Sequence, residues 1–226
     1  MDLAIQNELA EHLCQFITPS RREKLEQILQ ERTKYIVPVL EDLNQPHNMS
    51  AAIRSIECFG LQDVYVVEQQ NRFAPNLGVS KGSSNWVSMK RYANPGHNNT
   101  EDCFSDLRAQ GYRIFVTSPH VHDIPLAKVP LDKKIALVFG SEERGVSLYA
   151  QEHADGHVYI PMHGFTESFN VSVTIALCCY DLVHRVRSSS QINWRLSELE
   201  KSAIRLEWLR TLVRGSDCLE RDFLSL

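Results

Sequence analysis

The chain has 226 residues, of which 43% are hydrophobic and 23% charged, and its formal net charge at pH 7 is −4. This length and apolar fraction suit one sizeable domain with helical extensions and argue against a disordered chain. The acidic balance gives no global basic signature, so any binding of nucleic acid must depend on local clusters of arginine and lysine.

Cysteine spacing and hydropathy exclude several further classes. The six cysteines, at positions 14, 58, 103, 178, 179 and 218, form no CxxC pair, and we interpret them as reduced structural thiols of a cytosolic protein. The first residues lack the basic start and apolar core of a signal peptide. No apolar run approaches the roughly 20 residues that span a bilayer. We therefore expect a cytoplasmic protein with no metal site and no membrane segment.

The first 34 residues are predicted to form a helical extension. Apolar spacing predicts a helix over 3–16. Ser20-Arg21-Arg22-Glu23 matches a capping box that would begin a second helix,. One face of that helix is rich in arginine and lysine, and the simplest interpretation of such a face is a solvated surface.

Strands and helices alternate over 35–187, which predicts an α/β domain. The expected strands are 35–40, 64–67, 114–117, 135–139 and 158–160, and the expected helices run from Asn48 to Gly60, over 101–110 and over 171–183,. Asn48 is expected to cap the first of these helices and Gly60 to end it. The segment 69–92 is expected to be a long loop or short helices. The opening strand–helix–strand order implies a parallel sheet with a right-handed crossover.

The alternation of strands and helices ends at residue 187, and we assign 188–226 to a C-terminal helical tail. Ser188-Ser189-Ser190-Gln191 reads as a flexible joint, and Ser197-Glu198-Leu199-Glu200 is a second capping box,. The helix that follows is apolar on one side, so it is expected to pack on its own domain or on a partner. The sequence leaves both alternatives open.

Several common active-site motifs are absent. The chain contains neither G-x-G-x-x-G nor G-x-x-x-x-G-K-S/T, and neither G-x-S-x-G nor H-E-x-x-H,. His47, His163 and His184 are interpreted as structural or solvent-facing. Two polar corners remain, Gly140-Ser141-Glu142 and the run from Gly164 to Asn170. They follow the strands 135–139 and 158–160, which we expect to be neighbours, and such corners suit a polar ligand.

Three segments in this order resemble the motifs of the SpoU family of RNA ribose 2′-O-methyltransferases. They are Asn48-x-x-Ala51-x-x-Arg54 closing on Phe59-Gly60, Leu137-Val138-Phe139-Gly140-Ser141-Glu142-x-x-Gly145-Val146-Ser147, and Ile160-Pro161-Met162-x-Gly164-x-x-x-Ser168-Phe169-Asn170-Val171-Ser172-Val173. The stretch 21–48 and Gly82-Ser83-Ser84-Asn85-Trp86 are similar to the TrmH branch, which methylates a D-loop guanosine in tRNA.

The resemblance implies properties that neither composition nor periodicity reveals. It implies a mostly parallel α/β sheet flanked by helices with a C-terminal deep trefoil knot, S-adenosylmethionine bound in that knot, and a homodimer. The expected activity is methylation of the ribose of a tRNA guanosine. Two alternatives stay open: the same chemistry on ribosomal RNA, and an RNA-binding protein that has lost catalysis.

The same resemblance assigns roles to individual residues of this chain. The implied cofactor contacts are Thr117, Gly140, Ile160, Ser168 and Phe169. The implied catalytic and structural constellation is Asn48, Arg54, Glu142, Ser168 and Asn170. The candidate RNA contacts are Arg21, Arg22, Arg32, Arg185 and Arg187.

Two residues depart from the family pattern, and one implied role is chemically awkward. Phe169 stands where leucine is more common, which is expected to narrow the cofactor pocket. Gln45 replaces a common lysine, which is expected to weaken tRNA affinity. Arg54 is the residue usually assigned to activate the ribose hydroxyl, but a guanidinium with a pKa above about 12 supplies almost no free base. We hypothesise that Arg54 binds a phosphate or stabilises the developing alkoxide.

Overall fold

The computed structural model describes residues 3–76, 82–118 and 123–225. The chain divides into two compact units, Lys34–Trp194 and a helical unit made of Met1–Thr33 with Arg195–Leu226. The larger unit extends beyond Arg187 to Trp194, because the Arg187 guanidinium lies 4.9 Å from the centre of the Trp194 ring, and Trp194 packs against the core.

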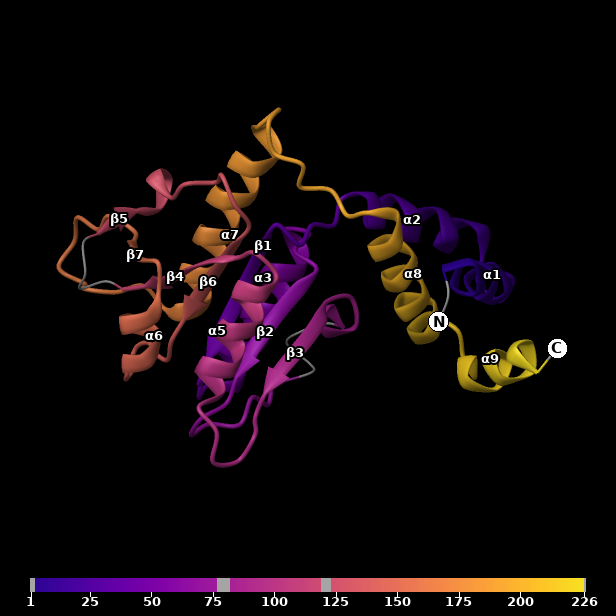
Figure 1. Ribbon diagram of the computed structural model, residues 1–226, viewed down its shortest axis with the longest axis horizontal. Coiled ribbons are helices and arrows are strands. Elements are labelled where there is room, and N and C mark those ends of the chain that lie inside the picture. The colour runs from indigo at the N-terminus through magenta and orange to yellow at the C-terminus, as the bar shows by residue number, and fades with distance from the viewer. Residues whose placement is uncertain (1–2, 77–81, 119–122, 226) are drawn as a thin grey trace. The chain divides into compact units, whose positions relative to one another are not determined.

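The larger unit is built on a seven-stranded sheet in which every pairing is parallel. Its strands are β1 (Ile36–Glu41), β2 (Asp63–Val67), β3 (Ser88–Tyr92), β4 (Arg113–Thr117), β5 (Ile124–Pro125), β6 (Ile135–Phe139) and β7 (Gly156–Tyr159). The spatial order is β3-β2-β1-β6-β4-β7-β5 (Figure 1). Every residue of β1 and β6 is buried, as expected for central strands covered on both faces,.

Helices cover both faces of this sheet. They are α3 (Pro46–Cys58), α5 (Asn99–Ala109), α6 (Leu148–His153) and α7 (Val171–Ser188), with short 3-10 turns η1 (Ser83–Asn85) and η2 (Leu126–Lys128). The apolar side chains of α3 and α7 belong to one core cluster, and those of α5 and α6 to another. In Figure 1, α5 and α6 are drawn next to each other, and these two helices are in contact. The α/β class and the five predicted strands are confirmed.

The sheet also contains two strands that the sequence did not predict. β3 reads Ser-Met-Lys-Arg-Tyr and lies at an exposed edge, so it lacks the apolar pattern of a buried strand,. β5 has two residues, too few for any periodicity. The prediction that 135–139 and 158–160 are neighbours was wrong, because β4 lies between β6 and β7. Strand order depends on contacts remote in sequence, which local patterns do not encode.

Helix ends show which capping signals operate. Gly60, with φ of 76°, follows the end of α3 as predicted. Asn48 was wrongly predicted to cap α3: Pro46 occupies the first turn, and Gln45 is the cap residue,. The Ser20 capping box was also wrong, since α2 (Pro19–Gln30) is capped by Thr18, whose hydroxyl accepts from the Arg21 backbone N–H.

The smaller unit is a helical assembly built from both ends of the chain. Its helices are α1 (Leu3–Cys14), α2, α8 (Glu198–Leu212) and α9 (Ser216–Leu224). α8 packs on α1 and α2, and α9 packs on α1. The capping box of Ser197 and Glu200 is confirmed. The C-terminal tail therefore packs on the N-terminal helices of the same chain. Within residues 3–76, 82–118 and 123–225, no helix has the length and hydrophobicity needed to cross a membrane.

Candidate functional site

The three sequence motifs meet at the carboxyl edge of the sheet. β1, β6, β4 and β7 are consecutive in the sheet, so the segments that follow them all leave from the same edge. Those segments carry Asn48, the Gly140–Ser147 run, and the loop from Ile160 to Asn170. In a parallel sheet this edge is where ligands usually bind, since backbone donors and helix starts converge there.

Asn48, Glu142 and Asn170 form a closed hydrogen-bonded triangle. One carboxylate oxygen of Glu142 accepts from Asn48 Nδ2 at 2.9 Å, and the other accepts from Asn170 Nδ2 at 2.6 Å. Asn170 Nδ2 also donates to Asn48 Oδ1 at 3.2 Å. One residue comes from each motif, so the triangle joins segments that are 94 and 122 residues apart from Asn48.

The start of α7 fixes the orientation of the Asn170 amide. Its Oδ1 accepts from the Ser172 backbone N–H at 2.9 Å and from the Ser172 hydroxyl at 2.6 Å, which makes Asn170 the helix cap,. The amide nitrogen is thereby directed to Glu142. Asn48, which does not cap α3, donates instead to Glu142 and to Gln45 Oε1 at 3.0 Å.

The turn after β6 requires glycine at both ends. A Cβ on Gly140 would lie 2.1 Å from the Gly145 carbonyl carbon and oxygen. Gly145 has φ of 67°, and its N–H donates to the Ser141 carbonyl at 2.8 Å. Larger residues would collide or strain the backbone here. The glycines thus make a tight loop that presents Glu142 at its tip.

Beside the triangle lies a cavity of about 410 Å³ whose walls come from the segments after β4, β6 and β7. It is lined by Thr117 and Ser118, Phe139–Val146, Gln151, Val158, Tyr159, Ile160, Met162, Glu167, Ser168, Phe169, Val171, Thr174 and Cys178. All five residues predicted to contact the cofactor lie in this lining. Its size is in the range of small-ligand pockets.

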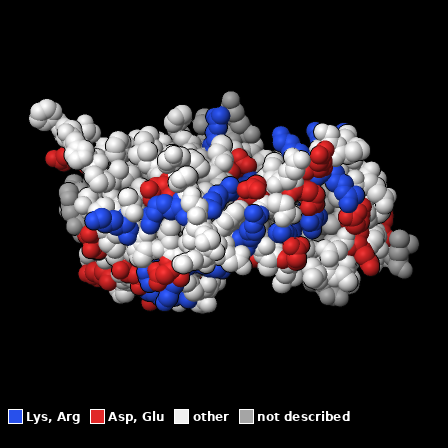
Figure 2. All heavy atoms as spheres, turned by 90° about the horizontal axis from the view of Figure 1, so that it is seen from above, with Lys and Arg blue, Asp and Glu red and all other residues white. Residues whose placement is uncertain are grey.

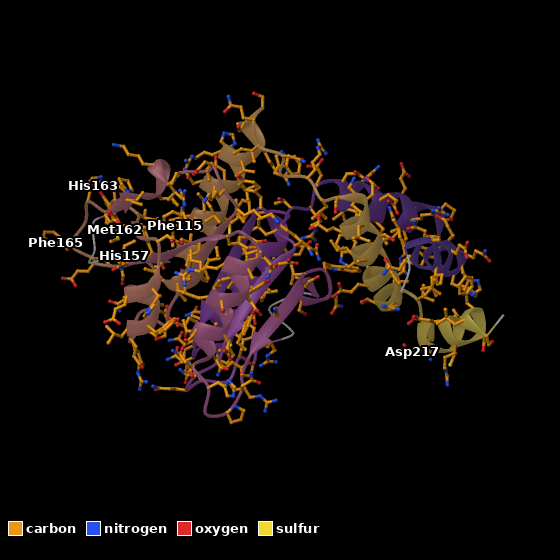
Figure 3. All side chains as sticks on the ribbon, in the orientation of Figure 1. Phe115, His157, Met162, His163, Phe165 and Asp217 are labelled. Carbon is orange, nitrogen blue, oxygen red and sulfur yellow. The ribbon has the colours of Figure 1, made fainter. Side chains whose placement is uncertain are left out.

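Most of the loop between β7 and α7 is exposed, although Ile160 and Met162 are half-buried. Met162, His163 and Phe165 lie on it, and Phe165 projects away from the sheet with its ring fully exposed (Figure 3). Ser168, also exposed, makes no side-chain hydrogen bond to any residue that the structure describes. The Ser168 hydroxyl therefore remains available to a ligand in the cavity.

Arg54 is separate from the triangle. It lies on the exposed side of α3, six residues and about 120° around the helix from the buried Asn48,. Among the described residues it has no hydrogen-bond or ion-pair partner. The structure thus brings Asn48, Glu142 and Asn170 together and leaves Arg54 as a solvated cation near the same corner of the sheet.

The three arginines predicted to bind RNA from the N-terminal segment differ in accessibility. Arg21 is exposed, and Arg22 is exposed but binds both carboxylate oxygens of Glu11 at 2.7 and 2.9 Å. Arg32 is only 1% exposed, with its guanidinium 5.2 Å from the centre of the Trp208 ring. The location of Arg32 contradicts a surface contact with RNA, because the side chain belongs to the interior of the helical unit.

The two arginines of α7 also differ. Arg185 is half-buried and donates to the backbone carbonyls of Leu126 at 3.1 Å and Val129 at 2.5 Å, so it ties α7 to η2. Nη1 also donates to Asp181 at 3.2 Å, so both terminal guanidinium nitrogens are engaged within the protein, and an RNA contact by Arg185 stays a prediction. Arg187 is exposed and stacks on Trp194.

Sequence reasoning missed two contributors to the site. Gln45 was noted as a departure, yet it is also a hydrogen-bond partner of Asn48. Cys178 belongs to α7 and lines the cavity. The sequence of this helix is apolar throughout the segment around Cys178, so no local pattern marked the residue as part of the site. Burial raises the pKa of the Cys178 thiol well above its ordinary value, which keeps the thiol protonated,. In the described parts of the chain, no cluster of metal-binding side chains is present.

Comparison with known proteins assigns this arrangement to a family. The SpoU rRNA Methylase family model matches residues 35–180. A tRNA (guanosine(18)-2'-O)-methyltransferase of Borreliella burgdorferi is 39% identical over 92% of this chain and 93% of its own. The enzyme of the same name from Thermus thermophilus is 28% identical over 85% of this chain and 97% of its own.

A solved structure extends the similarity to the fold. The TrmH/SpoU tRNA modifying enzyme of A. aeolicus superposes with a TM-score of 0.76 and 26% identity, covering 87% of this chain and 98% of that one. The family match includes β1, α3, the glycine loop and the start of α7, which together supply the hydrogen-bonded triangle and the cavity. On these grounds, the chain belongs to the SpoU methylase family of RNA methyltransferases.

Proposed function

We propose that the protein is an S-adenosylmethionine-dependent tRNA (guanosine-2′-O-)-methyltransferase that acts on a D-loop guanosine. The observation that carries this proposal is the Asn48–Glu142–Asn170 triangle, which stands beside a cavity formed by the same motifs. The names of the relatives from Borreliella and Thermus support tRNA guanosine as the substrate.

The cavity suits S-adenosylmethionine in size and chemistry. Phe139, Val158 and Ile160 offer apolar surface for an adenine ring or a methionine chain, while Glu142 and Glu167 offer carboxylates to cationic groups,. The proposed contacts are Thr117, Gly140, Ile160, Ser168 and Phe169. When bound, the cofactor supplies an electrophilic methyl group on a positively charged sulfur. The Thr117 hydroxyl donates to the Val138 carbonyl at 3.0 Å, so it can offer a ligand only an acceptor,.

Glu142 is proposed as an orienting group. Both of its carboxylate oxygens already accept hydrogen bonds from amide groups, at 2.9 and 2.6 Å. These two bonds fix the orientation of the carboxylate and use two of its roughly four lone-pair positions. In this proposal Glu142 fixes the orientation of the Asn48 and Asn170 side chains, and Ser168 contacts the ribose.

Arg54 is proposed to act through its positive charge, by binding or stabilising a negatively charged group of the RNA. As a solvated guanidinium on α3 it can bind the phosphate next to the target ribose, or stabilise the alkoxide that develops at the 2′-oxygen,. The proton of the 2′-hydroxyl then leaves to a phosphate oxygen or to water. The methyl group that replaces this proton on the 2′-oxygen would come from S-adenosylmethionine held by Thr117, Gly140, Ile160, Ser168 and Phe169.

The proposed RNA-binding surface is sparse. On the face drawn in Figure 2, lysine and arginine atoms are interleaved with aspartate and glutamate atoms and form no broad basic field. Arg21, Arg22 and Arg187 are the predicted contacts with exposed side chains, and Arg187 stacks on Trp194. Arg22 can contribute only by exchanging Glu11 for a phosphate. RNA affinity should then depend on a few point contacts.

A homodimer is proposed on the basis of α7. Val173, Leu177 and Tyr180 are 45%, 38% and 62% exposed and recur at intervals of four and three residues, so they share one face of the helix,. An apolar face of this kind is typical of an interface. The C-terminal deep trefoil knot and the cytoplasmic location remain part of the proposal, the first supported by the fold similarity to the A. aeolicus enzyme.

A second candidate substrate is ribosomal RNA, which the name of the matching family model favours. The deciding experiment is transfer of labelled methyl from S-adenosylmethionine to unmodified tRNA and to unmodified rRNA in separate reactions, with nucleoside analysis. We expect 2′-O-methylguanosine in tRNA with the wild type and not with Arg54→Ala. Label in rRNA alone would support the second candidate. Cofactor binding without labelling of either RNA would contradict both.

A further inference from the structure

Glu41, the last residue of β1, is a buried carboxylate with a complete set of partners. It is 1% exposed. One oxygen accepts from the Thr100 hydroxyl at 2.5 Å and from the Ser147 hydroxyl at 2.8 Å, and the other accepts from the Ser147 backbone N–H at 2.7 Å. A buried carboxylate is costly without such donors, so these hydrogen bonds offset the cost and hold Glu41 and its partners in one arrangement.

The partner Ser147 ends the loop that lines the cavity. It directly follows Val146, the last residue of the Phe139–Val146 lining, and its hydroxyl accepts from the Ala150 N–H at 3.1 Å to cap α6. Gln151, one turn into α6, lines the cavity and donates to the Val146 carbonyl at 3.0 Å. A shift of Ser147 would therefore move both the loop and α6.

The same corner of the fold also holds the beginning of this loop. Asn48, in the first turn of the helix that follows Glu41, donates to Glu142 at 2.9 Å. The β1–α3 corner thus contacts the loop after β6 at two points. Asn48 binds Glu142 near the beginning of the loop, and Glu41 binds Ser147 at its end. Between them the contacts of the loop include the Ser141–Gly145 bridge and the hydrogen bond from Gln151 to the Val146 carbonyl.

We propose that Glu41 is a positioning residue of the cofactor site, which holds Ser147 so that the Phe139–Val146 loop keeps the shape that binds S-adenosylmethionine. This inference rests on the proposed function, since it takes the cavity to be the cofactor site. Glu41 touches no part of the cavity, so its effect passes through Ser147.

The test compares Glu41→Ala with Glu41→Gln, by calorimetric titration with S-adenosylmethionine alone and by steady-state methylation. Glu41→Ala should raise the Kd for S-adenosylmethionine about tenfold or more, because loss of a positional restraint near a site has effects of this order. Glu41→Gln keeps an acceptor for the Ser147 N–H and should recover most of the affinity. The KM for RNA should change little in both variants.

Asp42 provides the matched control. Its carboxylate accepts from the backbone N–H groups of Gln69, Gln70 and Asn71 at 3.1, 2.8 and 2.7 Å, and that loop lies outside the cavity lining. Asp42→Gly removes a comparable anchor, and glycine tolerates the φ of 52°,. This variant should lose thermal stability yet bind S-adenosylmethionine like the wild type.

The outcomes separate the inference from the proposed function. Failure of the wild type to bind S-adenosylmethionine would overturn the function itself. If the wild type binds, the inference is overturned by wild-type affinity in Glu41→Ala, or by an equal loss of affinity in Asp42→Gly. Should Glu41→Ala not fold, Ser147→Ala removes one of the three hydrogen bonds. It should weaken cofactor binding in the same direction, and unchanged affinity would overturn the inference.

Discussion

Asn170 performs two tasks with the two ends of a single amide group. Its oxygen caps α7 by accepting from Ser172, and its nitrogen donates to Glu142 and Asn48. Helix capping alone would be satisfied equally by serine or aspartate. The asparagine amide combines a capping oxygen with a separate NH2 group whose two hydrogens reach Glu142 and Asn48, which explains why the residue type matters to the triangle,.

Replacement of Asn170 should separate these tasks. Asn170→Asp keeps the cap but sets a second carboxylate against Glu142, whereas Asn170→Ser keeps the cap and adds no charge. We expect kcat/KM for RNA methylation to fall about 100-fold in Asn170→Asp and less in Asn170→Ser, since like charges repel at this distance. Circular dichroism should report an intact helix content in both. Equal activities of the two variants would show that charge repulsion is not the cause.

Arg54→Lys tests how the cation acts. Lysine preserves the charge but lacks the planar fork that binds a phosphate at two points. We expect kcat/KM to fall roughly tenfold or more, with S-adenosylmethionine affinity unchanged because Arg54 is outside the cavity lining,. Near-wild-type activity would argue against a bidentate phosphate contact and favour simple charge stabilisation.

At the scale of elements, α7 is exposed and apolar on the side opposite its core face. Ile175, Cys178 and Leu182 are buried against the sheet, and Val173, Leu177 and Tyr180 are exposed. The Tyr180 ring lies 6.3 Å from that of Phe59, which extends the apolar surface to the end of α3. A helix that is apolar on both sides is suited to burial on both sides.

A charge placed on this face should disrupt the proposed dimer. Leu177→Glu would bury a carboxylate in the interface, so the variant should have a monomeric mass by light scattering where the wild type is dimeric. Ser190→Glu adds the same charge at an exposed position beyond the end of α7 and should leave the mass unchanged. A dimeric Leu177→Glu protein would place the interface elsewhere.

For the molecule as a whole, buried cysteine thiols and a buried tyrosine hydroxyl should limit the stability of the fold at alkaline pH. Burial raises the pKa of Cys179 to about 12 and raises that of Cys103 and Cys178 in the same direction. The pKa of Tyr65 is also raised, chiefly by burial. Each of these groups ionises more readily in the unfolded chain than in the folded one.

Stability should therefore decline in alkali. A group whose pKa is raised by folding contributes its full stabilisation below the unfolded pKa, about 8.5 for cysteine, and loses it as the pH rises through the folded value. We expect the urea midpoint to be constant between about pH 7 and 8 and to fall above about pH 9. Cys179→Ala should reduce that fall. An unchanged midpoint up to about pH 11 would contradict the prediction.

The sequence by itself determined the elements whose signals are local, together with the family. Apolar runs identified the five long parallel strands, Gly60 and Ser197 marked helix ends, and three motifs pointed to the SpoU methylases. Each of these signals lies in neighbouring residues. They correctly predicted an α/β sheet with a polar site at its carboxyl edge, because strand ends and helix caps are set by short-range sterics and hydrogen bonding.

The tertiary structure alone decided what depends on contacts remote in the chain. It placed β4 between β6 and β7, paired Asn48 with Glu142 instead of using it as a cap, buried Arg32, and directed the half-buried Arg185 to backbone carbonyls. It also packed the C-terminal helices on the N-terminal ones. The physical reason is that a side chain's hydrogen-bond partners and burial are fixed by the elements that pack around it, and these come from distant parts of the sequence.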